Sequence, residues 1–207
     1  MLRHADFAQA LPGMTTLTAL SDPADPRWSG MAAMPSHAAL ALAAGARTDL
    51  FIVRGSLAGY PPGSFVSIAG TAQARVLNAG SEGALLFMYR DLFATSGGAV
   101  ARPGQRQWID GGSAGLHIAP LLAQEDRLML VHWQAGARVG LHGHPHGEEI
   151  LVLSGQLQDR RGSYPAGSWL RLYPGDVHAP FADEETLILL RNGHLRTPIF
   201  NHAKERA

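Results

Sequence analysis

The sequence predicts an all-β protein in which one β-rich unit of about 100 residues occurs twice. Three observations lead to this class. Glycine and proline are frequent, at 24 and 13 residues, and are spread along the 207-residue chain, as in folds of short strands joined by turns. No long stretch carries the apolar period of an amphipathic helix. Three segments of the first half also recur, in the same order, in the second half. We therefore expect two small barrels or sandwiches.

The repeat consists of three ordered matches. They pair residues 49–57 (DLFIVRGSL) with 149–157 (EILVLSGQL), 60–68 (YPPGSFVSI) with 164–172 (YPAGSWLRL), and 82–88 (EGALLFM) with 184–190 (EETLILL). The offsets are 100, 104 and 102 residues, so only small insertions separate the copies. We predict one unit at residues 1–97 and a second at 98–207. Their junction falls in residues 95–107 (TSGGAVARPGQRQ), a segment rich in glycine and arginine that has no periodicity.

The individual elements follow in chain order. Residues 5–11 have the composition of a short helix, residues 14–20 (MTTLTAL) that of a strand, and two Asp-Pro pairs make residues 21–30 a loop. The alanine-rich residues 38–46 have helical propensity, but their place in the repeat favours a strand. In the second unit we expect strands at residues 115–124, 126–134, 150–153, 168–172 and 186–190.

Charge and cysteine content exclude several kinds of protein. The chain has 17 basic and 17 acidic residues, so it lacks the field that would hold a nucleic acid or an anionic membrane. It has no cysteine, which excludes disulfides, thiolate nucleophiles and cysteine-ligated zinc. The N-terminal sequence lacks the basic start and apolar core of a secretory signal. We expect a cytoplasmic protein whose partner is a small molecule.

A group of histidines and glutamates predicts a metal site. His142 and His144 are two residues apart, so on a strand both side chains project from the same face. Glu148 follows after a short turn, and His178 comes directly after a Pro-Gly turn. Imidazole and carboxylate together suit one divalent ion of Zn, Fe, Ni or Mn. Glu149 is a competing carboxylate, but strand alternation would direct it away from the interior if Glu148 faces inward.

The remaining histidines have a simpler explanation. His146 falls in a turn and is expected to face solvent. Surface or hydrogen-bonded core roles are expected for five others, His4, His37, His117, His194 and His202. Residues 111–115 match the Gly-x-Ser-x-Gly nucleophile elbow, but a strand-like segment follows where that elbow requires a helix. As candidates to line a ligand pocket we name Trp133, Trp169, Phe181 and His132.

The same residues carry a family resemblance. The pattern Gly136-x5-His142-x-His144-x3-Glu148-x6-Gly155 resembles the first motif of the cupin superfamily. Residues 174–178 (PGDVH) resemble the second motif in looser form, and Ala182 stands where cupins usually have asparagine. The segments GEEILVLSG and YPAGSWLRLYPGDVHAPF are most similar to the cupin domain of ChrR-type anti-sigma factors. The resemblance implies a bicupin of two jelly-roll barrels, with His142, His144, Glu148 and His178 as metal ligands.

The first unit lacks such ligands. By the repeat, Leu42, Ala44, Thr48 and Ala74 occupy the four positions, so we expect a barrel without metal.

Two functions are open at this point. The ChrR resemblance implies a regulatory, ligand-sensing cupin. A sigma factor is not an expected partner, because the Cys-containing zinc domain that binds sigma factors in that family is missing from this sequence. The alternative is a mononuclear non-haem metal dioxygenase, or an isomerase, that acts on a small oxygenated organic compound. A homodimer is a further expectation from cupins in general.

Overall fold

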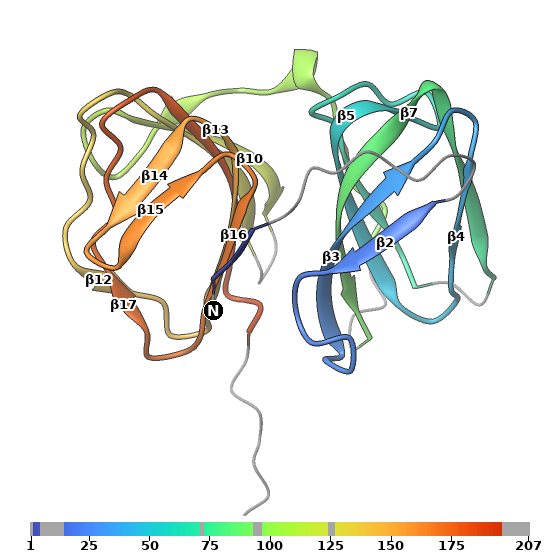
Figure 1. Ribbon diagram of the computed structural model, residues 1–207, viewed down its shortest axis with the longest axis horizontal. Coiled ribbons are helices and arrows are strands. Elements are labelled where there is room, and N and C mark those ends of the chain that lie inside the picture. The colour runs from blue at the N-terminus through green and yellow to red at the C-terminus, as the bar shows by residue number, and fades with distance from the viewer. Residues whose placement is uncertain (1, 5–14, 71–72, 93–96, 124–126, 196–207) are drawn as a thin grey trace, which may run out of the picture.

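The computed structural model describes residues 2–4, 15–70, 73–92, 97–123 and 127–195. Figure 1 shows two β-rich lobes side by side, joined by a segment that crosses the top of the view. The described residues contain one short helical element, the 3-10 helix η1 (Pro103–Gln105) in that segment. The expected helix at residues 5–11 lies outside the described residues. No helix in the described part of the chain is long and apolar enough to cross a membrane.

The first lobe is one antiparallel sheet of seven strands, β2 to β8. They are β2 (Thr16–Ala19), β3 (Arg27–Met34), β4 (Ala39–Leu42), β5 (Arg47–Leu57), β6 (Phe65–Ile68), β7 (Arg75–Asp91) and β8 (Val100–Ala101). The strand order is β2-β3-β7-β5-β6-β8, and β4 pairs with the far part of the long strand β7. Residues 39–42 of the alanine-rich segment 38–46 are therefore a strand, as the repeat predicted, because β7 supplies the backbone partners that its propensity alone does not select, and residues 43–46 form the turn that follows.

The second lobe contains the strands from β9 onward. They are β9 (Ile109–Asp110), β10 (Leu116–Ala123), β11 (Arg127–Trp133), β12 (His142–Gly143), β13 (Glu148–Ser154), β14 (Gln156–Asp159), β15 (Gly162–Pro165), β16 (Ser168–Leu172), β17 (Val177–His178) and β18 (Thr186–Asn192). The main sheet has the order β1-β16-β13-β18-β11-β10-β9, and β12-β17 and β14-β15 form two-stranded sheets. This all-β fold agrees with the predicted class.

The first strand of the chain belongs to the second lobe. Strand β1 (Leu2–His4) pairs with β16 through Leu2 and Leu170, at the edge of the main sheet of the second lobe. The predicted first unit, residues 1–97, includes β1, whereas β8 of the first lobe lies beyond residue 97, so strand pairing and this division differ at these two short strands. The three residues of β1 have no sequence feature that selects one sheet edge over another, because any edge strand offers the same unpaired backbone groups.

Strand pairing repeats between the lobes. Asp49 on β5 lies opposite Ser67 and Tyr89, and Glu149 on β13 lies opposite Arg171 and Arg191. Both central strands also have a register shift at the equivalent point, between 52 and 54 and between 152 and 154. The similarity in sequence thus reflects the same local geometry in both lobes. One assignment changes: His142 pairs with His178, and Leu42 pairs with Arg75, so Arg75 rather than Ala74 corresponds to His178.

The glycine that follows each central strand has a steric reason. Gly55 and Gly155 have φ angles of 69° and 71°, in the left-handed region. A Cβ atom would lie 2.1 Å from the carbonyl oxygen of Gly83 at the first position and 2.3 Å from that of Glu185 at the second. No side chain fits at either position.

Three apolar clusters form the core. One fills the first lobe and includes Leu50 and Ile52, and a second fills the other lobe and includes Ile150 and Val152. The third contains buried residues of both lobes, such as Phe51 and Leu151, and lies between them. Each central strand therefore buries both of its faces. This explains the run of four apolar residues in each copy of the repeat, where a strand with one face in water would alternate.

Candidate metal centre

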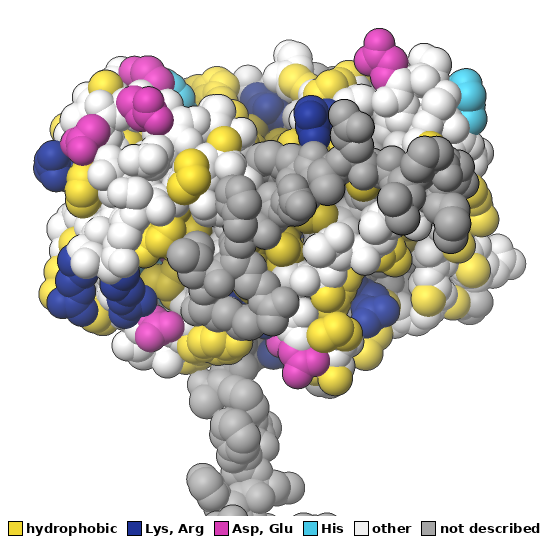
Figure 2. Space-filling model, in the orientation of Figure 1, with side chains coloured by type: hydrophobic (Ala, Val, Ile, Leu, Met, Phe, Trp, Pro, Cys, Tyr) yellow, Lys and Arg dark blue, Asp and Glu magenta, His cyan; other side chains and the backbone are white. Residues whose placement is uncertain are grey.

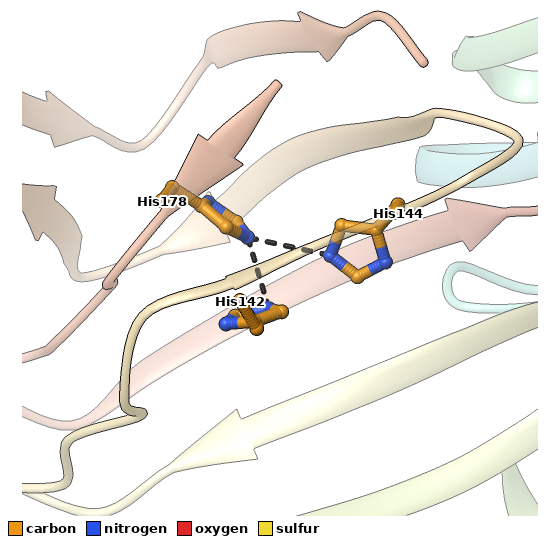
Figure 3. A group of neighbouring side chains, drawn as sticks. All are labelled: His142, His144 and His178. Carbon is orange, nitrogen blue, oxygen red and sulfur yellow. Dashed lines mark hydrogen bonds between the residues drawn. The ribbon is translucent and has the colours of Figure 1, made fainter. Parts of the chain in front are cut away.

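Three histidine side chains meet at one end of the second lobe. His142 on β12 lies directly opposite His178 on β17, and His144 follows β12 in the chain. The Nε2 atom of His178 is 3.1 Å from that of His142 and 3.4 Å from that of His144 (Figure 3). Within the described residues this is the one group of three or more potential ligands whose donor atoms lie together, all within 4.8 Å.

Glu148, at the start of β13, adds a carboxylate to the three histidines. Its Oε2 atom is 3.0 Å from Nε2 of His144, and its Oε1 atom is 3.4 Å from Nε2 of His178. The side chain is buried, at 1% exposure, and Oε1 has no hydrogen-bond partner. A buried carboxylate oxygen without a donor is costly, so this position favours a cation. The structure thus brings together the four residues that the sequence analysis named.

The spacing of these atoms suits a metal ion. An ion about 2.1 Å from each ligand atom holds neighbouring ligand atoms about 3.0 Å apart in octahedral geometry and about 3.4 Å apart in tetrahedral geometry. The separations given above lie between 3.0 and 3.4 Å. The Nδ1 atom of His142 is 2.8 Å from the carbonyl oxygen of Gly140. Since that contact keeps the proton on Nδ1, the lone pair of Nε2 faces the other ligands.

Burial changes the protonation of the group. It raises the pKa of Glu148 to about 8. Burial, followed by the charges of His142 and His144, lowers the pKa of His178 to about 4. Burial and then the charge of His142 also lower the pKa of His144. At neutral pH His144 and His178 are therefore uncharged and can offer lone pairs, whereas the carboxyl of Glu148 has to release its proton when a divalent ion binds. The donor set and its electrostatics both suggest a divalent metal.

Glu149 lies on the opposite face of β13, as strand alternation predicted. Its carboxylate accepts a hydrogen bond of 2.7 Å from the hydroxyl of Ser29 in the first lobe and one of 2.5 Å from Nε of Arg171. Arg171 also donates to Asp25 of the first lobe, at 2.7 Å. Both Glu149 and Arg171 are 2% exposed. Glu149 is thus part of a buried ionic network between the lobes and takes no part in the metal centre.

Asp49 has the equivalent position in the first lobe. It accepts a hydrogen bond of 2.6 Å from the hydroxyl of Ser67 and forms an ion pair with Arg191 of the second lobe. Arg47 lies 3.4 Å away on the same strand. Each lobe therefore contributes an acidic residue from its central strand to the interface, and each of these acids contacts the other lobe.

The acid at position 149 predicts a pH dependence of stability. Burial alone would raise the pKa of Glu149, but hydrogen bonds and charge from His194, the charge of Arg171 and a hydrogen bond from Ser29 lower it from 4.5 to about 2. Because the folded-state pKa is depressed, the stabilisation is present above pH 4.5 and is lost as the pH falls toward 2. We expect the free energy of unfolding, measured by urea titration between pH 6 and pH 2.5, to fall more steeply in the wild type than in Glu149→Gln. Equal slopes would contradict this assignment.

A cavity of about 220 Å³ adjoins the metal centre inside the second lobe. His142, His144, Glu148 and His178 line one part of it, and eleven of its 18 lining residues have apolar side chains. Many of the lining residues occupy alternate positions of a strand. On β11 they are Met129, Val131 and Trp133, and on β18 they are Ile188, Leu190 and the polar Asn192. Among the apolar residues that line the cavity, the sequence analysis named only Trp133. The alternation on β11 and β18 is the signal that could have identified the rest.

Three of the four pocket candidates are placed elsewhere. Trp169 is fully buried in the cluster between the lobes. Phe181 packs under the guanidinium of Arg138, and His132 contacts Glu185, with 2.5 Å between Nε2 and Oε2. Because successive residues of a strand face opposite sides, His132 points away from the cavity that its neighbour Trp133 lines.

The remaining candidate residues of the sequence analysis lie outside the metal centre. Residues 111–115 form the turn between β9 and β10, and no helix follows, so the nucleophile elbow is absent from this segment. His146 is exposed, as expected. His194 is buried, and its Nε2 atom lies 3.4 Å from Oε2 of Glu149, so it belongs to the network between the lobes. In the first lobe, a space of only about 10 Å³ lies beside Leu42, Thr48 and Arg75. That volume holds at most one water molecule.

The all-β fold and the histidine group at one end of the cavity agree with the cupin resemblance of the sequence. Residues 96–196 match the family model described as the ChrR cupin-like domain. The match covers 101 of the 207 residues, and together with the fold it shows that the second lobe is similar to cupin domains. The comparison with curated proteins found no match.

Solved structures share the fold across nearly the whole chain. YlbA from E. coli aligns with a TM-score of 0.70 and 13% identity, over 92% of this chain and 89% of its own. A mutant of oxalate decarboxylase from Bacillus subtilis also gives a TM-score of 0.70 and 13% identity, over 95% and 78%. A candidate dioxygenase from Nostoc punctiforme gives 0.72 and 10%, over 94% and 80%. At these identities the likeness concerns the fold alone.

Proposed function

We propose that this protein is a bicupin that binds one divalent metal ion in its second lobe and senses a small organic ligand there. His142, His144, Glu148 and His178 would hold the ion. The observation that carries the proposal is the convergence of these four side chains, which includes a buried carboxylate oxygen without a hydrogen-bond partner. The first lobe supports the bicupin part, because its strand registers repeat those of the second lobe.

The remaining cavity wall supports sensing over catalysis. Apart from the four proposed ligands, Ser113 and Asn192 are the only residues in the described part of the wall that bring polar side-chain oxygen or amide groups to it. Acid–base catalysis needs a positioned group that can exchange a proton near neutral pH, and neither side chain has one. A cavity that binds a ligand without such a group fits a regulatory role. The match to the ChrR cupin-like domain points in the same direction.

A mononuclear metal dioxygenase is the second candidate. The likeness in fold to a candidate dioxygenase favours it, and so does the number of proposed ligands. Four protein ligands fill a tetrahedral site but leave two positions open on a six-coordinate ion such as iron. Zinc would therefore support a closed site, and iron would supply open positions for oxygen chemistry.

Metal analysis tests the proposal directly. For protein purified from cells grown without added metal, elemental analysis is expected to give one divalent ion per chain. A protein that contains no divalent metal, and takes up none from zinc, iron, nickel or manganese salts, would contradict the proposal. Protein reconstituted with iron can then be assayed for oxygen uptake with small ketones and hydroxyketones. Substrate-dependent uptake would favour the dioxygenase over the sensor.

A further inference from the structure

The charge distribution inside the cavity of the second lobe limits what it can bind. Among the described residues that line it there is no lysine, arginine or aspartate, and Glu148 is the one acidic residue. A divalent ion held by neutral imidazoles and one carboxylate has a net charge of +1. One further negative charge on a ligand would neutralise it. A second negative charge would find no cationic partner among the described lining residues, where the other polar side chains are the neutral Ser113 and Asn192, and an unpaired buried charge is strongly unfavourable.

The polar and apolar parts of the cavity occupy different regions. On β18, Asn192 pairs with Glu148 of β13 at one end of the strand, and Thr186 pairs with Trp133 of β11 at the other. Between these ends, Leu190 and Ile188 line the cavity together with Met129 and Val131 on β11. A ligand whose polar head reaches the metal centre would therefore place the rest of its body along apolar side chains.

Charged residues outside the cavity do not alter its charge balance. Arg171 and Arg191 are buried on the outer faces of their strands, in contact with Glu149 and Asp49. On the face of the molecule in Figure 2, basic and acidic side chains are interspersed over the described part of both lobes. Two charged residues outside the lining, Arg161 and Asp159, act on His178 with opposite sign, so together they add no net positive charge beside the metal centre.

We infer that the site takes a small organic monoanion with one oxygen-donor head group and an apolar body, such as a monocarboxylate with a short chain or single ring. The inference rests on the proposed function, because it assigns the head group to the metal centre. The cavity volume of about 220 Å³ equals that of about seven water molecules at about 30 Å³ each. That space suits a compact body and excludes a long lipid chain.

A series of carboxylates tests the inference by titration calorimetry on the metal-loaded protein. Hexanoate is expected to bind on the order of 100-fold more tightly than acetate, because each added methylene that is buried contributes about fourfold. Adipate, with a second carboxylate at the far end of the chain, is expected to bind at least tenfold more weakly than hexanoate. Adipate affinity equal to or above that of hexanoate, or no gain from acetate to hexanoate, would overturn the inference.

Two variants locate the binding in this cavity. Met129 lines the cavity and is half-buried, so in Met129→Lys the ammonium can approach a second carboxylate. We expect this variant to reduce the preference for hexanoate over adipate at least tenfold. Ile109→Lys, at a position on β9 that is 54% exposed and outside the cavity, is the matched control and should leave the preference unchanged. If Met129→Lys does not fold, Val139→Phe narrows the cavity at a half-buried position and should weaken hexanoate more than acetate.

The two proposals fail in different ways. A protein without metal contradicts the proposed function, and the inference fails with it. A protein that holds one metal ion, yet binds dianions as well as monoanions or shows the same preference in Met129→Lys, keeps the proposed function and loses the inference. Metal content is measured independently of ligand binding, so the two results are read separately.

Discussion

Replacing Arg171 by methionine is expected to lower the free energy of unfolding by about 3–5 kcal/mol. The guanidinium is buried and donates to Glu149, to Asp25 and to the carbonyl oxygen of Arg27. Without it, the carboxylate of Glu149 remains buried with hydrogen bonds from neutral groups but without its nearest cation. Urea unfolding at pH 7, followed by circular dichroism, measures the change.

A matched control separates burial from charge. Arg138 forms an ion pair of 3.1 Å with Asp183, but the two side chains are 64% and 58% exposed. Exposed pairs contribute at most about 1 kcal/mol, so Arg138→Met should have a small effect. The double variant Arg171→Met/Glu149→Gln removes the unpaired charge and is expected to recover part of the lost stability. A double variant no more stable than Arg171→Met would show that the loss comes from packing rather than from the uncompensated carboxylate.

Replacing His178 by alanine is expected to weaken metal binding by at least 100-fold. His178 is the histidine whose Nε2 atom lies within 3.4 Å of both other Nε2 atoms and of Glu148. Its loss leaves an open position on the side of β17, and losing even a residue that only supports a ligand typically costs 10- to 100-fold in affinity. Competition with a chelator of known affinity gives the dissociation constant, and elemental analysis gives the occupancy.

Two other histidines serve as controls for this result. His146 is exposed in the turn before β13, and His132 contacts Glu185 outside the cavity. Alanine at either position should leave the metal affinity within about threefold of wild type, since neither side chain belongs to the group of proposed ligands. Wild-type occupancy in His178→Ala, with the fold intact by circular dichroism, would show that the proposed ligand set is wrong.

Much of the candidate site could be predicted because it depends on local geometry. His142 and His144 are two residues apart, and Glu148 and Glu149 are adjacent, so alternation alone decides which side chains share a face. The Pro-Gly turn before His178 placed a fourth residue at the same end of the lobe. The repeat identified residues 38–46 as a strand against their helical propensity, because a copied register is stronger evidence than the preference of alanine.

Other features depend on contacts between segments that are distant in the chain. Trp133 and Trp169 are both aromatic residues of buried strands, but one lines the cavity and the other packs between the lobes. The sequence cannot distinguish them, because both faces of these strands are apolar. Arg171 looked like an exposed arginine that could recognise an anion. In the structure its partners Asp25 and Glu149 are separated from it by 146 and 22 residues.

The amino-acid sequence by itself determined the all-β class, the repeat and the grouping of His142, His144, Glu148 and His178. The first two, and the grouping of His142, His144 and Glu148, follow from short-range periodicity or from a comparison of the chain with itself, whereas His178 was added because of its Pro-Gly turn and the resemblance to the second cupin motif. Tertiary structure alone decided the pairing of β1 with β16, the ionic network between the lobes and the apolar wall of the cavity. These depend on which sheet faces meet, and that choice is made by the packing of whole lobes rather than by any one strand.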